Sequence, residues 1–208
     1  YHSDDLVHWH FDGVLLVPDT SWDCHGVYTG STVVEDDRLA VIYTGNVKVD
    51  GDHDFIHSGR EARIIRIDRY PDGSWSPKRL LLSWQDYPTF CTRHVRDPKV
   101  WRQGHEWFMV TGARRQDDQG MVLLWRSDDG EQWHFQSVIT SEKAFGYMWE
   151  CPDLFRLDGR WFLSFSPQGV PREQNRRQNI YLSGYIPMKG GDDPRTAALD
   201  GDFVDWDY

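Results

Sequence analysis

Cysteine is scarce in this sequence: the 208 residues contain three, at positions 24, 91 and 151, with no Cys-x-x-Cys pair among them. An odd number of widely spaced cysteines indicates neither a disulfide framework nor a structural zinc site, and it favours a reducing compartment. The nine histidines are scattered without the spacing of a ligand set. We therefore expect no metal and no cofactor.

Long apolar runs and basic stretches are also missing. No segment approaches the roughly 20 apolar residues of a transmembrane helix, and no secretory signal opens the sequence. Acidic residues outnumber basic ones by 33 to 23, which gives a net charge of −10. We therefore expect no nucleic-acid partner, no membrane partner and a cytoplasmic location. The first residue is not methionine, which leaves open a leader on a longer precursor.

Amphipathic helical periodicity is absent as well, and short β-branched or aromatic runs take its place. Residues 62–67 precede a Pro-Asp-Gly turn, and residues 121–125 precede an Asp-Gly turn. Runs of this length bounded by such turns are typical of strands. Aromatic residues make up 14% of the chain, with 11 tryptophans, which favours a well-packed core over disorder. The sequence predicts an all-β fold.

Internal repeats narrow the architecture. Residues 3–11 match residues 127–135 at six of nine positions, and each copy reads as a polar turn followed by a short aromatic strand. Residues 98–108 parallel residues 152–162, which lie 54 positions later, as strand, turn and strand. Repeated sheets of this spacing favour a β-propeller, whereas a β-sandwich explains the strands but not the repeat. Pro and Gly crowd residues 187–194, which we expect to form a loop.

The second repeat also aligns charged residues. Arg96-Asp97-Pro98 in the first copy corresponds to Glu150-Cys151-Pro152 in the second. Equivalent turns of neighbouring blades should place Arg96 opposite Glu150, and Asp97 opposite Cys151, at the mouth of the channel. Carboxylates and an arginine in a concave site suit glycoside hydrolysis. The alternative is structural, because an acidic residue before proline often accepts backbone hydrogen bonds at a turn.

The residues before Glu150 bear on its chemistry. Tyr147, Met148 and Trp149 are large and mostly apolar, so we expect them to shield the carboxyl from water. A shielded carboxyl stays protonated near neutral pH, as a general acid requires.

Several motifs, in order along the chain, resemble those of glycoside hydrolase family 32, which includes invertases, sucrose-6-phosphate hydrolases, levanases and inulinases. The two clearest are Arg96-Asp97-Pro98-Lys99-Val100 and Trp149-Glu150-Cys151-Pro152-Asp153-Leu154-Phe155. Residues 4–9, 26–34 and 43–46 also fit family motifs, and residues 165–169 are most similar to the sucrose-6-phosphate hydrolase branch. The resemblance extends from end to end of the chain.

The resemblance implies a five-bladed propeller followed by a C-terminal β-sandwich, which we expect to be absent from these residues. It also implies a retaining β-fructofuranosidase that acts on sucrose or sucrose 6-phosphate. Glu150 would be the acid/base catalyst and Asp97 the transition-state stabiliser. The other residues that the resemblance assigns to the substrate site are Arg96, Tyr28, Thr29, Trp149 and Cys151. Among them, Cys151 would tune the acid, and Trp149 would pack against the acid or the substrate unless its role is purely structural. Alternatives are a levan or inulin hydrolase, a carbohydrate-binding propeller without catalysis, and a purely structural propeller.

The family's nucleophile, an Asp in a Trp-x-Asn-Asp-Pro-Asn-Gly motif, has no counterpart in this sequence. Asp193-Pro194 is the remaining Asp-Pro pair, and it lies too late in the chain and lacks the Asn neighbours. We therefore expect residues 1–208 to be a single partial propeller domain that lacks the nucleophile-bearing first strand and the last blade. Substrate preference and oligomeric state do not follow from the sequence.

The 208 residues on their own should show no turnover, because retaining hydrolysis needs two carboxyl groups about 5–5.5 Å apart. Release of fructose from sucrose, sucrose 6-phosphate or inulin by the purified chain checks this expectation. Measurable turnover would contradict it.

Overall fold

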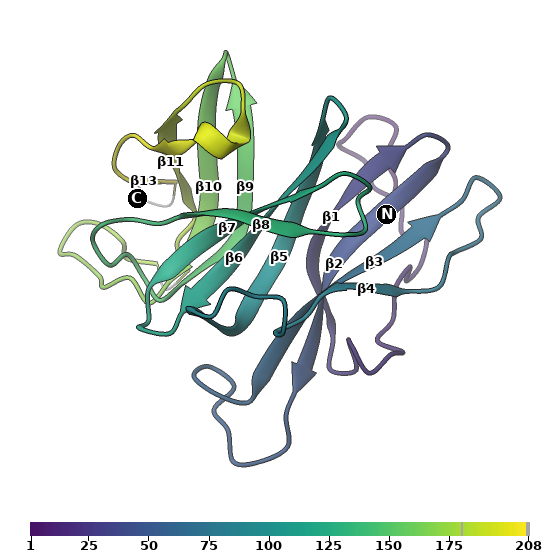
Figure 1. Cartoon of the computed structure of the whole chain (residues 1–208), viewed down its shortest axis with the longest axis horizontal. Helices are drawn as coiled ribbons and strands as arrows, with labels where there is room; N and C mark the ends of the chain where they lie inside the picture. Colours follow the sequence, from purple (N-terminus) through teal and green to yellow (C-terminus); the bar gives the residue numbers. More distant parts are fainter. Residues whose placement is uncertain (180, 207–208) are drawn as a thin grey trace.

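The computed structural model describes residues 1–179 and 181–206. Within them, the regular elements are antiparallel strands and one short 3-10 helix, which confirms the all-β prediction. Figure 1 shows three sheets that follow one another along the chain from the purple N-terminal part to the yellow C-terminal part. None of the helical segments in this part of the chain is long and apolar enough to cross a membrane.

Each sheet is built from consecutive strands. The first contains β1 (Val27–Glu35), β2 (Arg38–Lys48), β3 (Arg60–Arg69) and β4 (Arg79–Leu82). The second contains β5 (Cys91–Gln103), β6 (Glu106–Arg115), β7 (Gly120–Ser127) and β8 (His134–Ile139). The third contains β9 (Met148–Leu157), β10 (Arg160–Gln168) and β11 (Gly184–Lys189). The same sheet also contains β12 (Ala198–Leu199) and β13 (Val204–Asp205), which both pair with β11. The 3-10 helix η1 spans Pro194–Thr196.

The middle sheet is buried on both faces. Side chains alternate between the faces of a strand, so Met109 of β6 packs with the first sheet while Val110 packs with the third. The side chains of β7 alternate in the same way, with Leu123 in the core shared with the first sheet and Leu124 in the core shared with the third. This explains why residues 121–125 are a continuous apolar run rather than an alternating one. The two cores fix the three sheets against one another.

The 54-residue repeat corresponds to a repeated hairpin. The first copy forms β5 and β6, and the second copy forms β9 and β10. The strand-turn-strand prediction for both segments is therefore confirmed.

The other repeat is confirmed only in its turn. In both copies, the serine Oγ accepts a hydrogen bond from the backbone N–H three residues later. Leu6 donates to Ser3 (2.8 Å) in the first copy, and Gly130 donates to Ser127 (2.9 Å) in the second. After the turn, the second copy continues into β8, as predicted. The first copy forms no strand and contributes only an isolated bridge between His2 and His10, so that part of the prediction is wrong.

The segment 187–194 is not wholly a loop. Pro187 and Met188 belong to β11, where they pair with Phe162 and Trp161 of β10. Proline has no backbone N–H to donate, and its carbonyl accepts a hydrogen bond from the backbone N–H of Asp200 (2.9 Å). The loop begins only after β11.

Asp193-Pro194 has a structural role. The Asp193 side chain caps η1 by accepting the backbone N–H of Arg195 (2.9 Å), and Pro194 occupies the first turn. This agrees with its exclusion as the nucleophile.

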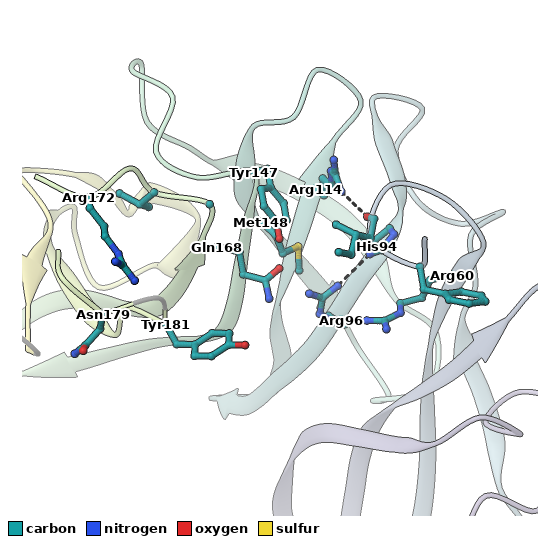
Figure 2. A pocket seen from close by; sticks show the side chains of 14 residues that line it. Arg60, His94, Arg96, Arg114, Tyr147, Met148, Gln168, Arg172, Asn179 and Tyr181 are labelled. Carbon is teal, nitrogen blue, oxygen red and sulfur yellow. Dashed lines mark hydrogen bonds between the residues drawn. The ribbon is translucent and has the colours of Figure 1, made fainter. Parts of the chain in front are cut away.

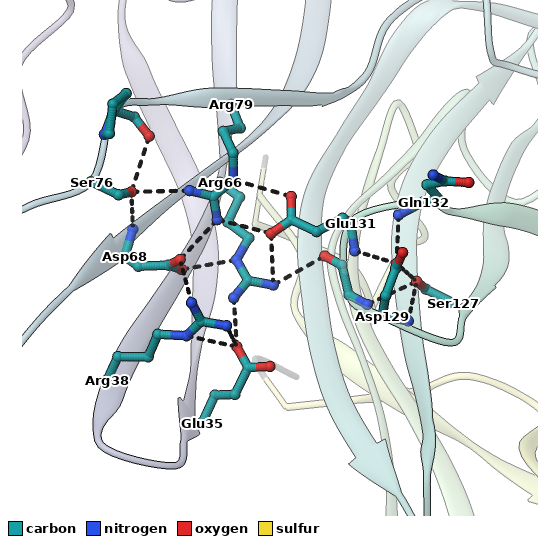
Figure 3. A network of polar contacts seen from close by, with 12 residues as sticks. Glu35, Arg38, Arg66, Asp68, Ser76, Arg79, Ser127, Asp129, Glu131 and Gln132 are labelled. Carbon is teal, nitrogen blue, oxygen red and sulfur yellow. Dashed lines mark hydrogen bonds and ion pairs between the residues drawn. The ribbon is translucent and has the colours of Figure 1, made fainter.

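An ion-pair network ties the first sheet to the second (Figure 3). Arg66 of β3 is 1% exposed, and its guanidinium donates to Asp68 Oδ1 (2.8 Å) and Glu35 Oε2 (2.5 Å) within the first sheet. Its Nη1 also donates to the backbone carbonyl of Gly130, in the turn before β8 (3.1 Å). Arg79 reaches the same turn through Glu131 (2.9 Å). The buried guanidinium of Arg66 thus links the two neighbouring sheets.

Replacement of Arg66 by alanine should lower the free energy of unfolding by about 3–5 kcal/mol, because it leaves buried carboxylates without their partner. Urea unfolding of the variant measures the loss. Arg69→Ala is the matched control, since Arg69 is exposed and loses only a contact with the Trp75 ring, worth about 1 kcal/mol or less. Equal losses in the two variants would contradict the role given to Arg66.

Candidate active site

The two predicted site segments form matching β-bulges. The pairing of β5 with β6 shifts between Arg96 and Lys99, and the pairing of β9 with β10 shifts between Ser164 and Ser166, opposite Glu150. Asp97 and Cys151 occupy equivalent positions with φ of 61° and 49°. This left-handed conformation is unfavourable for residues other than glycine and is concentrated at functional sites. The sequence repeat therefore reproduces one backbone distortion in two neighbouring sheets.

The bulges contact each other as the repeat predicts. Arg96 Nη2 donates to Glu150 Oε1 (2.7 Å), and the backbone N–H of Cys151 donates to Asp97 Oδ2 (3.0 Å). The expected pairs, Arg96 with Glu150 and Asp97 with Cys151, are both confirmed as contacts. Four of the predicted site residues thus lie in one cluster between β5 and β9.

The Glu150 carboxylate is held at both oxygens. Arg96 binds Oε1, and Gln168 Nε2 donates to Oε2 (2.7 Å) from the end of β10. The Glu150 side chain is 27% exposed, whereas Arg96 is 6% exposed and is also in contact with His94 Nδ1 (3.2 Å). A partly accessible carboxyl group fixed by two donors can exchange a proton with a molecule bound beside it.

The sequence did not predict Gln168 as a site residue. It lies in the segment 165–169 that resembled one branch of the family, but no role could be attached to it. Its position follows from strand pairing, because Ser166 pairs with Glu150 and Gln168 with Met148.

Asp97 is almost fully enclosed, with 5% of its surface exposed. Its backbone N–H donates to Thr44 Oγ1 (2.8 Å), and that hydroxyl donates to the carbonyl of Thr29 (2.9 Å). Burial raises the pKa of Asp97, and the neighbouring Glu150 adds to the effect, while Arg96 and the Cys151 backbone oppose it. The site therefore holds a carboxylate that is costly to ionise.

Cys151 carries a protonated thiol. Desolvation of the sulfur and the charge of Asp97 raise the pKa of Cys151 to about 11. Its thiol lies 3.8 Å from the Asp97 oxygen that its backbone also contacts. Cys151 therefore orients Asp97 rather than acting as a nucleophile.

Tyr28 and Thr29 of β1 lie in different places. Thr29 lines a cavity of about 380 Å³ together with Asp97 and Cys151. Tyr28 is 39% exposed and lies beneath the guanidinium of Arg60, 5.9 Å from its ring centre. Of the two, the structure brings Thr29 to the cluster.

Trp149 is a core residue, which corrects its assignment to substrate contact. It is 0% exposed, stacks on Phe165 (4.2 Å between ring centres) and donates from Nε1 to the carbonyl of Phe145 (2.7 Å). Adjacent side chains of a strand point to opposite faces, so Trp149 faces away from the carboxylate of Glu150.

A cavity of about 490 Å³ opens beside Glu150 at the ends of the strands (Figure 2). Both partners of the carboxylate, Arg96 and Gln168, line it, and so does Tyr147. The remaining walls come from the β2–β3 connection, the start of β5, the end of β6 and the β10–β11 connection. In the described part of the chain, no group of three or more His, Cys, Asp or Glu side chains is arranged to hold a metal ion.

Asp97→Asn should increase stability at neutral pH, because the folded protein no longer has to bury a charge. Since the folded pKa of Asp97 lies above its unfolded value, the wild type loses stability as pH rises between the two values. The gain should therefore be full at pH 7 and should shrink as pH falls toward 3.8. Urea midpoints of both proteins across this range provide the measurement, and a gain that does not vary with pH would contradict it.

Comparison with known proteins places this geometry in a family. The Glycosyl hydrolases family 32 N-terminal domain matches residues 1–206. The sucrose-6-phosphate hydrolase of Bacillus subtilis (strain 168) is 39% identical over 191 residues, which are 89% of this chain and 38% of that protein. The raffinose invertase of Escherichia coli is 36% identical over 210 residues, 99% of this chain and 42% of that protein. The chain thus spans about two fifths of the length of these relatives.

Solved structures agree with the sequence matches. Sucrose-6-phosphate hydrolase from Lactobacillus gasseri has a TM-score of 0.78 at 27% identity, covering 98% of this chain and 39% of that one. A Bombyx mori GH32 beta-fructofuranosidase in complex with sucrose has a TM-score of 0.74 at 34% identity, covering 91% and 39%. These matches confirm the predicted propeller fold, and no β-sandwich is present in the described residues. The chain belongs to glycosyl hydrolase family 32, and it matches the N-terminal domain of that family.

Proposed function

We propose that the full-length protein containing this chain hydrolyses the glycosidic bond of sucrose or sucrose 6-phosphate, with retention of configuration and with Glu150 as acid/base catalyst. The observation that carries the proposal is the cluster at the two bulges. It joins a partly exposed carboxylate, a buried carboxylate and an arginine beside an open cavity. Relatives named sucrose-6-phosphate hydrolase and raffinose invertase support the choice of substrate class.

Glu150 would act twice. As the acid, it gives its proton to the oxygen of the leaving sugar, and as the base it later removes a proton from water. Arg96 is already bound to Oε1, so its positive charge stabilises the carboxylate that forms when the proton leaves. Gln168 holds the other oxygen and fixes the plane of the carboxyl group.

Asp97 would stabilise the transition state. Its carboxylate can accept hydrogen bonds from fructosyl hydroxyls and attract the positive charge that develops on the sugar ring. Cys151 holds it through a backbone N–H, and Thr44 and Thr29 fix its backbone. A buried carboxylate, already desolvated before substrate binds, interacts more strongly with a developing cation than a solvated one.

The nucleophilic carboxylate belongs to the proposal as well. The double displacement needs a second carboxyl about 5–5.5 Å from the first. The curated relatives extend over more than twice the aligned length. We therefore assign residues 1–208 to part of the catalytic propeller and the nucleophile to the rest of the full-length protein.

A reducing, cytoplasmic compartment is part of the same proposal. Cys24, Cys91 and Cys151 are all free in the structure, as they would be in such a compartment.

Glu150→Gln in the full-length protein should lower kcat on sucrose by about 10²–10⁴-fold, because the leaving sugar then departs without its proton. A substrate with an acidic leaving group, 4-nitrophenyl β-fructoside, should lose less in the step that releases the aglycone. Glu142→Gln is the control, since Glu142 is an exposed carboxylate away from the cluster.

Initial rates on sucrose, sucrose 6-phosphate and inulin measure these effects and identify the preferred substrate. Unchanged rates in Glu150→Gln would refute the catalytic role. A folded wild-type protein that cleaves none of the three substrates would instead favour a carbohydrate-binding propeller.

A further inference from the structure

The cavity beside Glu150 is strongly positive in a chain of net charge −10. Four arginines line it, Arg60, Arg96, Arg114 and Arg172, and its lining includes no aspartate or glutamate. Figure 2 shows the guanidinium groups of Arg60 and Arg96 pointing toward each other on one side, while Arg172 extends toward the cavity from the other. Positive charge on all sides of a cavity favours an anionic ligand.

Two of these arginines are already neutralised. Arg96 pairs with Glu150 (2.7 Å), and Arg114 pairs with Asp118 (2.6 Å). Among the described residues, no ion pair joins Arg60 or Arg172 to a carboxylate, and the guanidinium of Arg60 lies over the ring of Tyr28. The cavity therefore presents two cations that form no ion pair with a carboxylate of the described residues.

Two buried donors in the same wall are also without partners. Arg60 Nε and His94 Nε2 are both enclosed, and neither donates a hydrogen bond within the described residues. Each such group costs about 1–3 kcal/mol when left unsatisfied. Both atoms are enclosed by protein in this structure, so a ligand satisfies them only after neighbouring side chains move.

The tautomer of His94 leaves Nε2 as an unpaired donor among the described residues. Its Nδ1 faces Arg96 Nη1 at 3.2 Å, and because arginine can only donate, Nδ1 is the acceptor. Burial and the charges of Arg96, Arg114 and Arg60 lower the pKa of His94 to about 3, so the ring is neutral and carries its proton on Nε2. The ring is 6% exposed and lines the cavity.

A phosphomonoester fits these requirements better than a carboxylate or a neutral sugar. It carries about −1.5 to −2 charges at pH 7 and three strong acceptor oxygens. Arginine suits such a group because its planar donors can bind two phosphate oxygens at once. The volume of about 490 Å³ is within the range of small-molecule sites.

The position of the cavity identifies which part of a substrate would enter it. Arg96 and Gln168 line the cavity and also hold the Glu150 carboxylate, so the cavity begins one side chain away from the proposed acid. The acid protonates the leaving group, so the sugar that departs lies on this side.

We propose that this cavity binds the phosphate of a phosphorylated leaving sugar through Arg60, His94 and Arg172, and thereby selects sucrose 6-phosphate over sucrose. The choice of the leaving sugar rests on the proposed function. The inference that the cavity binds an anion depends only on its arginines and unpaired donors.

The test compares kcat/KM for sucrose 6-phosphate and for sucrose in the full-length protein. The wild type should prefer the phosphorylated substrate. Arg60→Gln and Arg172→Gln should each lower kcat/KM for sucrose 6-phosphate by about 10- to 100-fold, the usual effect of losing a charge-assisted hydrogen bond. Their rates on sucrose should stay within about twofold, which also shows that the variants fold. Arg102→Gln, an exposed arginine on the far end of β5, should change neither rate.

Equal losses on both substrates, or no loss on either, would overturn the anion site. Binding of glucose 6-phosphate, measured by calorimetry against glucose and inorganic phosphate, gives a readout independent of catalysis. The wild type should bind glucose 6-phosphate at least 10-fold more tightly than the double variant. If the wild type cleaves neither substrate, the proposed function fails, and this binding difference still decides whether the cavity is an anion site.

Discussion

The contact between the two bulges, Arg96 with Glu150 and Asp97 with Cys151, is the constraint on which the site depends. It joins the first strands of two neighbouring sheets, so it exists only if those sheets are held at a fixed distance. The middle sheet provides that control, because β6 and β7 bury side chains in the cores on both of its faces. Packing of alternate residues therefore sets the geometry of a polar cluster that no single sheet could form.

The cluster is energetically unfavourable in several ways that the cores must offset. Asp97 and Cys151 adopt left-handed backbone, the Asp97 carboxylate is buried with a raised pKa, and two buried donors lack partners in the part of the chain that the structure describes. Each feature costs on the order of 1–3 kcal/mol, which is a large part of the stability of a typical domain. Such costs persist where a ligand or a transition state recovers them, and all of these features lie around the two facing bulges and the cavity beside them.

The sequence predicted the part of the site that follows from repetition. Equal spacing places Arg96 opposite Glu150, because residues 54 positions apart occupy the same point of neighbouring hairpins. The assignment of Trp149 to the substrate was wrong, because neighbouring residues of a strand point to opposite faces and the side chain of Trp149 is buried in the core. The sequence also gave no sign of Gln168, Arg60 or His94 as a group, since these come from separate strands that only the packing of the sheets brings together.

The most direct test of the account is a crystal structure of full-length Glu150→Gln with sucrose bound. The account predicts the fructosyl ring against the Asp97 carboxylate, with the glycosidic oxygen within about 2.6–3.2 Å of the side-chain amide at position 150. The glucosyl unit should extend into the cavity lined by Arg96 and Gln168. Sugar bound elsewhere on the propeller, with no contact to positions 97 and 150, would contradict it.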